Sequence, residues 1–190
     1  MRTLLLILLI TTNSIIGQAQ NSNAIELGDT VTNFSALDEN GDIWELKNNT
    51  SDFTVIYFYP AAMTYGCTKQ ACAYRDDKAT FDQLNTTIVA VSGDSPENLQ
   101  NFKKKYDLNF SLLSDFAGKL SKIFGVPISK GGSIERELFG KRITLTREIT
   151  VERWTFVLDK NRKVIYKNSK VNAVQDSKNV KEAIKNYKVG

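Results

Sequence analysis

The chain has 190 residues, enough for one domain with a substantial core, and its 42% hydrophobic and 24% charged residues are ordinary globular values. Its net charge is +4, and the densest basic run, at 103–105, is weak evidence for nucleic acid because no aromatic or Arg residues interleave with it; a solvated helix face is the favoured interpretation. The sequence contains no histidine, which excludes a Ser/His/Asp triad, a Cys–His dyad and any zinc or copper site that needs imidazole. Its chemistry must therefore use thiols, carboxylates, hydroxyls, lysines and arginines.

The first 19 residues have the pattern of a secretory signal. Arg2 precedes a short apolar run at 4–10, and the small residues Gly17 and Ala19 favour cleavage after Ala19. The run is too short to span a membrane, and an uncleaved amphipathic anchor is the alternative. We therefore expect 20–190 to form one domain that works outside the cytoplasm, secreted or periplasmic, where disulfides persist.

After this leader, extended and helical segments alternate along the chain. In order we expect a hairpin turning at 38–42, a strand buried on both faces at 53–59, a helix from Cys67, a buried strand at 86–92, a helix starting at Ser95 and Pro96, a strand at 110–115, a helix between Asp115 and Gly125, a hairpin turning at 159–162 and a helix at 175–187. This order predicts an α/β fold with a mixed central β-sheet flanked by helices and an N-terminal β-hairpin.

The segment 127–150 has a less regular pattern. Polar loop features fill most of it, and β-branched residues alternate only towards its end. We expect a long loop that feeds an extended strand, and we expect this strand to continue into residues 151–159.

The two cysteines, Cys67 and Cys72, follow the buried strand at 53–59. The loop at the carboxyl end of such a strand is a common place for a functional site. Cys67 falls in the first turn of the predicted helix, where free backbone N–H groups and the positive helix end favour a thiolate. Thr64 can point its hydroxyl at the same space, and Pro60 supplies an apolar wall.

The spacing of the cysteines limits how they can pair. On a regular helix, residues five positions apart have Cα atoms roughly 8.6 Å apart, whereas a disulfide requires less than about 7 Å. Cys67 and Cys72 therefore cannot bond while the helix is intact. A bridge formed after local unwinding remains open, as do a static structural disulfide and two unreactive core thiols.

A thiolate at Cys67 needs a cation, and lysine or arginine must supply it. Strand alternation in 151–159 places Arg153 on one face with Val151, Thr155 and Val157. A buried arginine is costly unless it is paired. Arg153 is therefore the best candidate partner for Cys67, and the alternative is an arginine that reaches solvent at a strand end.

The stretch PAAMTYGC (60–67) matches the Pro-x-x-x-Thr-x-x-Cys signature of peroxiredoxins. The wider stretch VIYFYPAAMTYGCTKQACAYRD resembles their bacterioferritin comigratory protein or Q-type subgroup, in which many members carry a second cysteine five residues on. The remaining segments resemble that subgroup in order and spacing, and the resemblance covers about 26–187. It implies a thioredoxin-like fold.

The resemblance also implies roles for individual residues. Cys67 would be the peroxidatic cysteine and Cys72 the resolving one, joined in an intramolecular disulfide during turnover. Thr64 and Arg153 would align and polarise the peroxide, and Pro60 would shield the thiolate.

Three features of the match are weaker. Gln70 falls where the family often has a polar residue near the site. Tyr65 stands where the family commonly has proline, a position that the signature leaves unspecified. The segment around 130–150 is longer and more polar than the family pattern.

By this resemblance the chain is an enzyme, an atypical two-cysteine peroxiredoxin that reduces hydrogen peroxide and organic hydroperoxides without a metal or other cofactor. Its partners would be the peroxide and an external dithiol reductant such as a thioredoxin-like protein, with no nucleic acid and no stable membrane insertion, in a monomer or weak homodimer. One alternative is an extracytoplasmic thiol–disulfide oxidoreductase, although that class has Cys-x-x-Cys. The other is a non-catalytic binding module on the same scaffold.

Overall fold

The computed structural model describes residues 24–189, so the predicted leader at 1–19 lies outside the described residues. Its elements, in chain order, are β1 (Ser35–Asp38), β2 (Ile43–Glu45), the 3-10 helix η1 (Leu46–Asn48), β3 (Phe53–Phe58), α1 (Tyr65–Asp76), α2 (Lys78–Gln83), β4 (Thr86–Ser92), α3 (Pro96–Tyr106), β5 (Ser111–Ser114), α4 (Lys119–Phe124), β6 (Ile128–Leu138), β7 (Lys141–Val151), β8 (Thr155–Asp159), β9 (Val164–Asn168) and α5 (Asp176–Val189).

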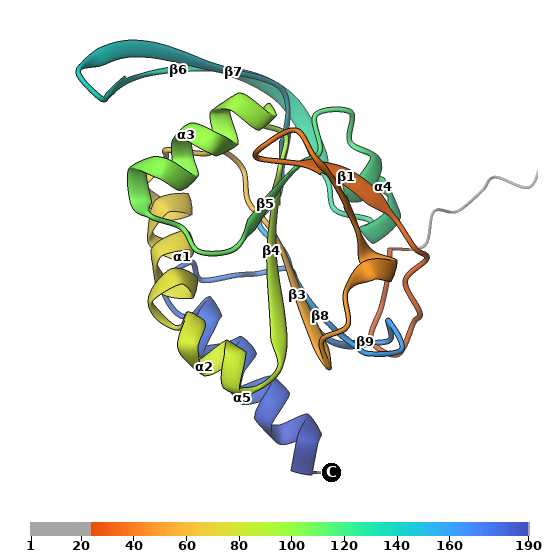
Figure 1. Ribbon diagram of the computed structural model, residues 1–190. Coiled ribbons are helices and arrows are strands. Elements are labelled where there is room, and N and C mark those ends of the chain that lie inside the picture. Colours follow the sequence, from red (N-terminus) through yellow and green to blue (C-terminus); the bar gives the residue numbers. More distant parts are fainter. Residues whose placement is uncertain (1–23, 190) are drawn as a thin grey trace, which may run out of the picture.

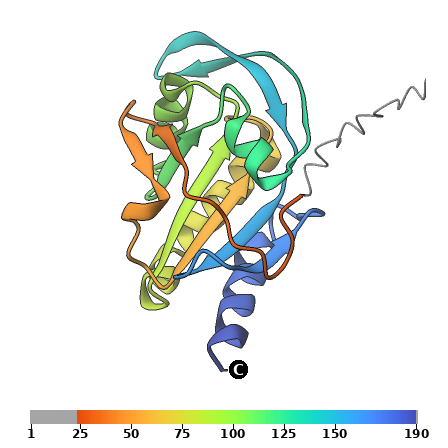
Figure 2. The same ribbon diagram turned by 90° about the vertical axis from the view of Figure 1, so that its right-hand side faces the viewer.

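A seven-stranded sheet in the order β2-β1-β5-β4-β3-β8-β9 forms the centre of the molecule. Strands β3, β4 and β5 run parallel, whereas β8, β9 and the β1–β2 hairpin add antiparallel pairs. Every residue of β3 is buried, because helices cover both faces of the sheet (Figures 1 and 2). The predicted mixed sheet with an N-terminal hairpin is confirmed.

The core has two layers, one on each face of this sheet. The first layer holds side chains of α1, α2, α3 and α5, and the second holds those of α4, η1 and the segment before β1. In β3, Val55 and Tyr57 face the first layer, and Ile56 and Phe58 face the second. This alternation places the carboxyl end of β3, and the loop after it, beside the helices of the first layer.

The helix ends follow the predicted signals. Ser95 accepts a hydrogen bond from the Asn98 backbone N–H at 3.3 Å, and Pro96 is the first residue of α3. The Asp115 carboxylate accepts hydrogen bonds at 2.8 Å from the first-turn N–H groups of Leu120 and Ser121, so it caps α4, which begins at Lys119. The helix predicted from Cys67 is divided, because α1 ends before Asp77 and α2 follows it.

The prediction of a long loop at 127–150 is wrong. Strands β6 and β7 form a separate two-stranded antiparallel sheet, the β6–β7 hairpin. Phe139 and Gly140 form its turn with φ angles of 53° and 76°, and positive φ at both residues is what a tight two-residue hairpin turn requires. The strand does not continue into β8, since residues 152–154 belong to no strand.

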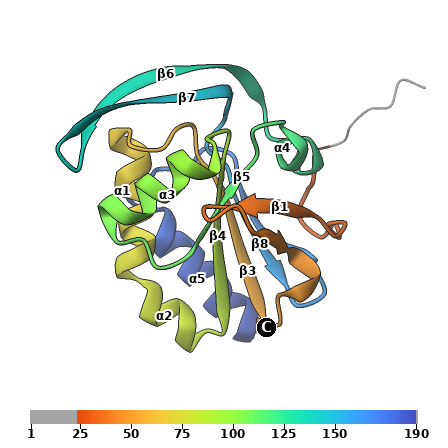
Figure 3. The ribbon, with the colours of Figure 1, turned by 45° about the horizontal axis from the view of Figure 1, so that its top comes forward.

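The β6–β7 hairpin arches above the ends of α1 and α3 (Figures 1 and 3). Its side chains Leu138 and Leu145 are buried in the first core layer. Arg136 Nε donates a hydrogen bond to the backbone oxygen of Met63 at 3.1 Å, so the hairpin contacts the loop after β3 directly.

The basic run at 103–105 is engaged within the chain. Lys103 donates to the carboxylate of Glu39 and, at 2.9 Å, to the backbone oxygen of Phe110, and Lys104 lies 4.8 Å from the centre of the Phe139 ring. Two of the three lysines therefore contact groups of this chain. Among residues 24–189, no helix is long and apolar enough to cross a membrane.

Candidate active site

The loop between β3 and α1 positions the first turn of α1. Its backbone is held by the Ala62 N–H, which donates to Asp94 Oδ2 at 2.8 Å, and it reverses direction at Met63 with φ 63°. Thr64 is extended and immediately precedes α1, and its hydroxyl donates to the Ala61 backbone oxygen at 2.9 Å. This loop therefore delivers Cys67 to the helix start, as the sequence predicted.

Cys67 is 1% exposed and lies in the first turn of α1. Its Sγ atom lies 3.2 Å from Arg153 Nη2, which donates to it. The free N–H groups and the positive end of the helix act in the same direction as the guanidinium, because each favours negative charge on the sulfur.

Arg153 reaches the sulfur from the stretch between β7 and β8. It shares the Cys67 side of the sheet with Thr155 and Val157, as predicted, whereas Val151 packs in the second core layer. The guanidinium also passes close to the backbone of Gly66, where an added Cβ would lie 3.4 Å from Nη2. The cation pairing predicted from strand alternation is present.

A buried polar network continues from Arg153 into the core. Arg153 Nη1 donates to Gln70 Oε1, and Gln70 Nε2 donates to Asp176 Oδ2 at 2.7 Å. The same oxygen of Asp176 accepts hydrogen bonds from Tyr74 and Thr155, both at 2.8 Å. The sequence analysis placed Gln70 near the site but missed Asp176, which resembles any acidic residue in the first turn of a helix.

Burial shifts the pKa of several of these groups. It raises the pKa of Asp176 above the usual range, although hydrogen bonds from Gln70, Tyr74 and Thr155 and the nearby charge of Arg153 oppose that rise. Burial also raises the pKa of Tyr57, Tyr59 and Tyr74 well above 10.0, so these phenols stay neutral at physiological pH.

Cys72 is half-buried on the same helix and is not bonded to Cys67. Cys67 and Cys72 both lie within the continuous helix α1, so the spacing argument applies to them directly. The structure therefore contains no bridge between the two cysteines.

Pro60 and Arg153 line the same recess. Val151 and the β6–β7 hairpin residue Ile128 also line it. The role of Pro60 as a wall for the Cys67 thiol stays a prediction. The hydroxyl of Thr64, which donates to Ala61, keeps its lone pairs available as acceptors.

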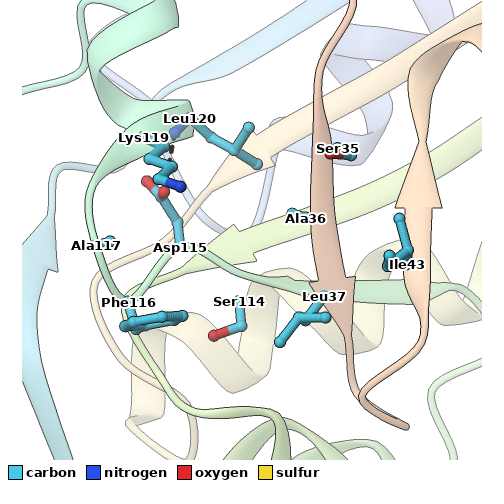
Figure 4. A pocket seen from close by; sticks show the side chains of 10 residues that line it. All are labelled: Ser35, Ala36, Leu37, Ile43, Ser114, Asp115, Phe116, Ala117, Lys119 and Leu120. Carbon is cyan, nitrogen blue, oxygen red and sulfur yellow. Dashed lines mark hydrogen bonds between the residues drawn. The ribbon is translucent and has the colours of Figure 1, made fainter.

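A second pocket lies between the β1–β2 hairpin and the loop before α4 (Figure 4). Its rim carries the exposed side chains of Leu37, Ile43 and Phe116. Neither cysteine lines it, so it is separate from the thiol site. Within the described residues, no group of three or more Cys, Asp or Glu side chains is placed to hold a metal ion.

A family model described as AhpC/TSA family matches residues 27–167. The chain therefore belongs to the AhpC/TSA family. Within it, similar proteins carry the name peroxiredoxin Q, chloroplastic. The one from Sedum lineare is 40% identical over 160 residues, which cover 83% of this chain and 75% of that protein. The one from Oryza sativa subsp. japonica is 38% identical over 161 residues, and the match spans 85% of this chain but only 66% of the rice protein.

Solved structures of the same type share the fold. Peroxidoxin BcpB from Mycobacterium tuberculosis has a TM-score of 0.71 and 32% identity, covering 85% of this chain and 97% of that one. Peroxiredoxin Q from Xanthomonas campestris has a TM-score of 0.67 and 28% identity, covering 81% and 90%. These matches confirm the thioredoxin-like fold and the resemblance to Q-type peroxiredoxins.

Proposed function

We propose that this chain is a thiol-dependent peroxidase in which Cys67 is the peroxidatic cysteine and Cys72 the resolving one. The observation that carries the proposal is the 3.2 Å contact between Cys67 Sγ and Arg153 Nη2 in the buried first turn of α1. The names of the relatives, all peroxiredoxins, support the same reaction class.

In the first step the Cys67 thiolate attacks one oxygen of a hydroperoxide. An S–O bond forms as the O–O bond breaks, and the electron pair leaves on the second oxygen, which takes a proton to become water or an alcohol. Sulfur is oxidised to a sulfenic acid and the peroxide is reduced. Arg153 and the amides of the α1 start stabilise charge on the reacting oxygens, and Thr64 accepts a hydrogen bond from the peroxide hydroxyl.

In the second step the Cys72 thiol attacks the sulfenic sulfur of Cys67. An S–S bond forms, the S–O bond breaks, and the oxygen leaves as water after taking the thiol proton. An external dithiol then reduces the bridge by exchange and is itself oxidised to a disulfide. In this mechanism Cys67 and Cys72 supply the two thiols. Thr64 and Arg153 orient the peroxide, and Pro60 shields the reacting sulfur.

One equivalent of peroxide is expected to convert the reduced chain into an intramolecular disulfide, seen by intact mass as the loss of two hydrogens in a monomer-sized species. Because α1 must unwind for Cys67 to reach Cys72, amide exchange across about residues 66–76 should be faster in the oxidised protein than in the reduced one.

The Cys72→Ser variant is the matched control for this experiment. It should stop at a sulfenic acid on Cys67 that dimedone traps. A disulfide-linked dimer from the wild-type chain would contradict the intramolecular step, and unchanged exchange in α1 with a confirmed bridge would contradict the unwinding.

The two rival functions predict different outcomes. A thioredoxin-fold oxidoreductase would exchange disulfides with a substrate protein and consume no peroxide, and a binding module would form no sulfenic acid on Cys67. The burial of Cys67 Sγ against Arg153 favours the peroxidase, because exchange with a bulky protein disulfide needs an exposed sulfur.

We also propose that residues 1–19 are a secretory signal and that 20–190 form the mature domain, a monomer or weak homodimer working in a secreted or periplasmic location. The support is the charged start, the short apolar run and the small residues before the expected cleavage point. The curated relatives are named chloroplastic, which is a statement about those plant proteins.

Expression of the full chain in a bacterium is expected to yield a periplasmic protein whose N-terminus is Gln20. Intact mass and N-terminal sequencing of the periplasmic fraction measure this. Recovery of the uncleaved chain from the cytoplasm would contradict the proposal, and recovery from membranes would favour the anchor.

A further inference from the structure

We propose that Asp176, at the start of α5, is a positioning residue that orients Arg153 on Cys67 through Gln70 and also holds α1 in its folded state. The inference deepens the proposed peroxidase function and rests on it. Asp176 touches neither cysteine through a hydrogen bond, so its influence on the sulfur passes through the side chains between them.

The contacts of Asp176 are concentrated on one oxygen. Oδ2 accepts from Gln70 Nε2 at 2.7 Å, from the Tyr74 hydroxyl at 2.8 Å and from the Thr155 hydroxyl at 2.8 Å. All four side chains belong to residues that are 0% exposed, so water does not replace a lost partner. Two of the three donors belong to α1, and the third belongs to β8, the strand that follows Arg153.

The side-chain amide of Gln70 links Asp176 to Arg153. Its carbonyl accepts from Arg153 Nη1, so its amino group must point the opposite way, towards Asp176. The reverse orientation would set an N–H₂ donor against the guanidinium, which has only donors. The carboxylate therefore fixes the amide, and the amide together with Cys67 holds the guanidinium by its two terminal nitrogens.

The same carboxylate resists the unwinding that disulfide formation needs. Gln70 lies between Cys67 and Cys72, so unwinding this part of α1 takes a donor away from Asp176. Asp176 Oδ1 is buried and has no partner among the described residues. A hydrogen bond lost at Oδ2 is therefore not replaced by one at Oδ1. Asp176 thus favours the folded α1, in which Cys67 reacts with peroxide, over the unwound α1, in which it meets Cys72.

Asp176→Asn is expected to move the two steps of the reaction in opposite directions. The variant keeps the shape but removes the charge, so the three donors converge on a neutral amide oxygen, and its NH2 group takes the place of Oδ1, which is buried without a partner among the described residues. Oxidation of Cys67 by peroxide should slow about tenfold, equivalent to ~1.4 kcal/mol of transition-state stabilisation. Formation of the Cys67–Cys72 disulfide should become severalfold faster, so less Cys67 is over-oxidised to sulfinic acid at high peroxide.

Quenched-flow mass spectrometry with dimedone measures both steps on one sample, from the fractions of thiol, sulfenic acid, disulfide and sulfinic acid. Asp115→Asn is the matched control, because Asp115 is also a buried carboxylate that accepts three hydrogen bonds, at the start of α4. It should lower the melting temperature without changing either rate.

Tyr74→Phe tests the same idea with a smaller change. It removes one α1 donor from Asp176, so it should speed disulfide formation while leaving the peroxide step nearly unchanged. This variant replaces Asp176→Asn as the test if Asp176→Asn does not fold. Wild-type rates in both variants, or a fall in both steps for Asp176→Asn, would overturn the inference. A wild-type chain that forms no sulfenic acid would instead overturn the proposed function itself.

Discussion

Cys67→Ser is expected to abolish peroxide consumption in the presence of dithiothreitol. Serine keeps the shape of the side chain, but its hydroxyl stays protonated beside Arg153 and is a poor nucleophile unless a base removes its proton. The sequence has no histidine to act as that base, and Asp176 is separated from position 67 by Gln70 and Arg153. The arginine and the helix amides alone therefore give no turnover.

The measurement is peroxide loss over time at equal concentrations of wild type and variant, with far-UV circular dichroism to show that the fold is kept. Cys72→Ser is the matched control, because it removes the other thiol and should still consume one equivalent of peroxide in a first, fast phase. Peroxidase turnover in Cys67→Ser would place the nucleophile elsewhere and end the proposal.

Arg153→Lys is expected to slow the reaction of Cys67 with peroxide by one to a few orders of magnitude, at ~1.4 kcal/mol for each tenfold. The charge is kept, but Arg153 contacts Cys67 with one nitrogen and Gln70 with another, and a single ammonium group cannot hold both positions. The thiolate loses a directed donor, and Gln70 Oε1 loses its partner in a buried place.

Rapid-mixing kinetics of the first turnover measure this loss. Arg136→Lys is a suitable control, since Arg136 also donates to the active-site loop, at the Met63 backbone oxygen, without contacting Cys67. It should change the rate little. Equal rates for wild type and Arg153→Lys would show that another cation serves the sulfur.

The parts of the fold predicted correctly from the sequence are those whose signals are local. Strands β3 and β4 are runs of mostly apolar and β-branched residues, and Ser95, Pro96 and Gly125 mark helix ends through their own side-chain and backbone chemistry. The pairing of Arg153 with Cys67 followed from strand alternation, although Val151 faces the other layer because the chain leaves the strand at 152–154.

The β6–β7 hairpin escaped prediction for a physical reason. Most side chains of β6 are exposed, and Arg147 interrupts the apolar face of β7, so alternation gave only a weak signal; Leu138 and Leu145 are the hairpin residues buried in the first core layer. Its turn uses Phe139 before Gly140, where Asn or Asp is the usual signal. Asp176 escaped for another reason, since its partners Gln70 and Tyr74 lie far away in sequence.

The β6–β7 hairpin also has a bearing on the solubility of the molecule. In the described part of the chain no strand pairs with the outer edge of β6, so that edge offers backbone N–H and C=O groups to a neighbouring molecule. Charged side chains follow one another along this edge: Lys130, Glu135, Arg136 and Glu137. These charges disfavour pairing between the edges of neighbouring molecules. The same polar side chains that weakened the sequence signal of the hairpin therefore protect a long exposed strand from forming intermolecular sheets.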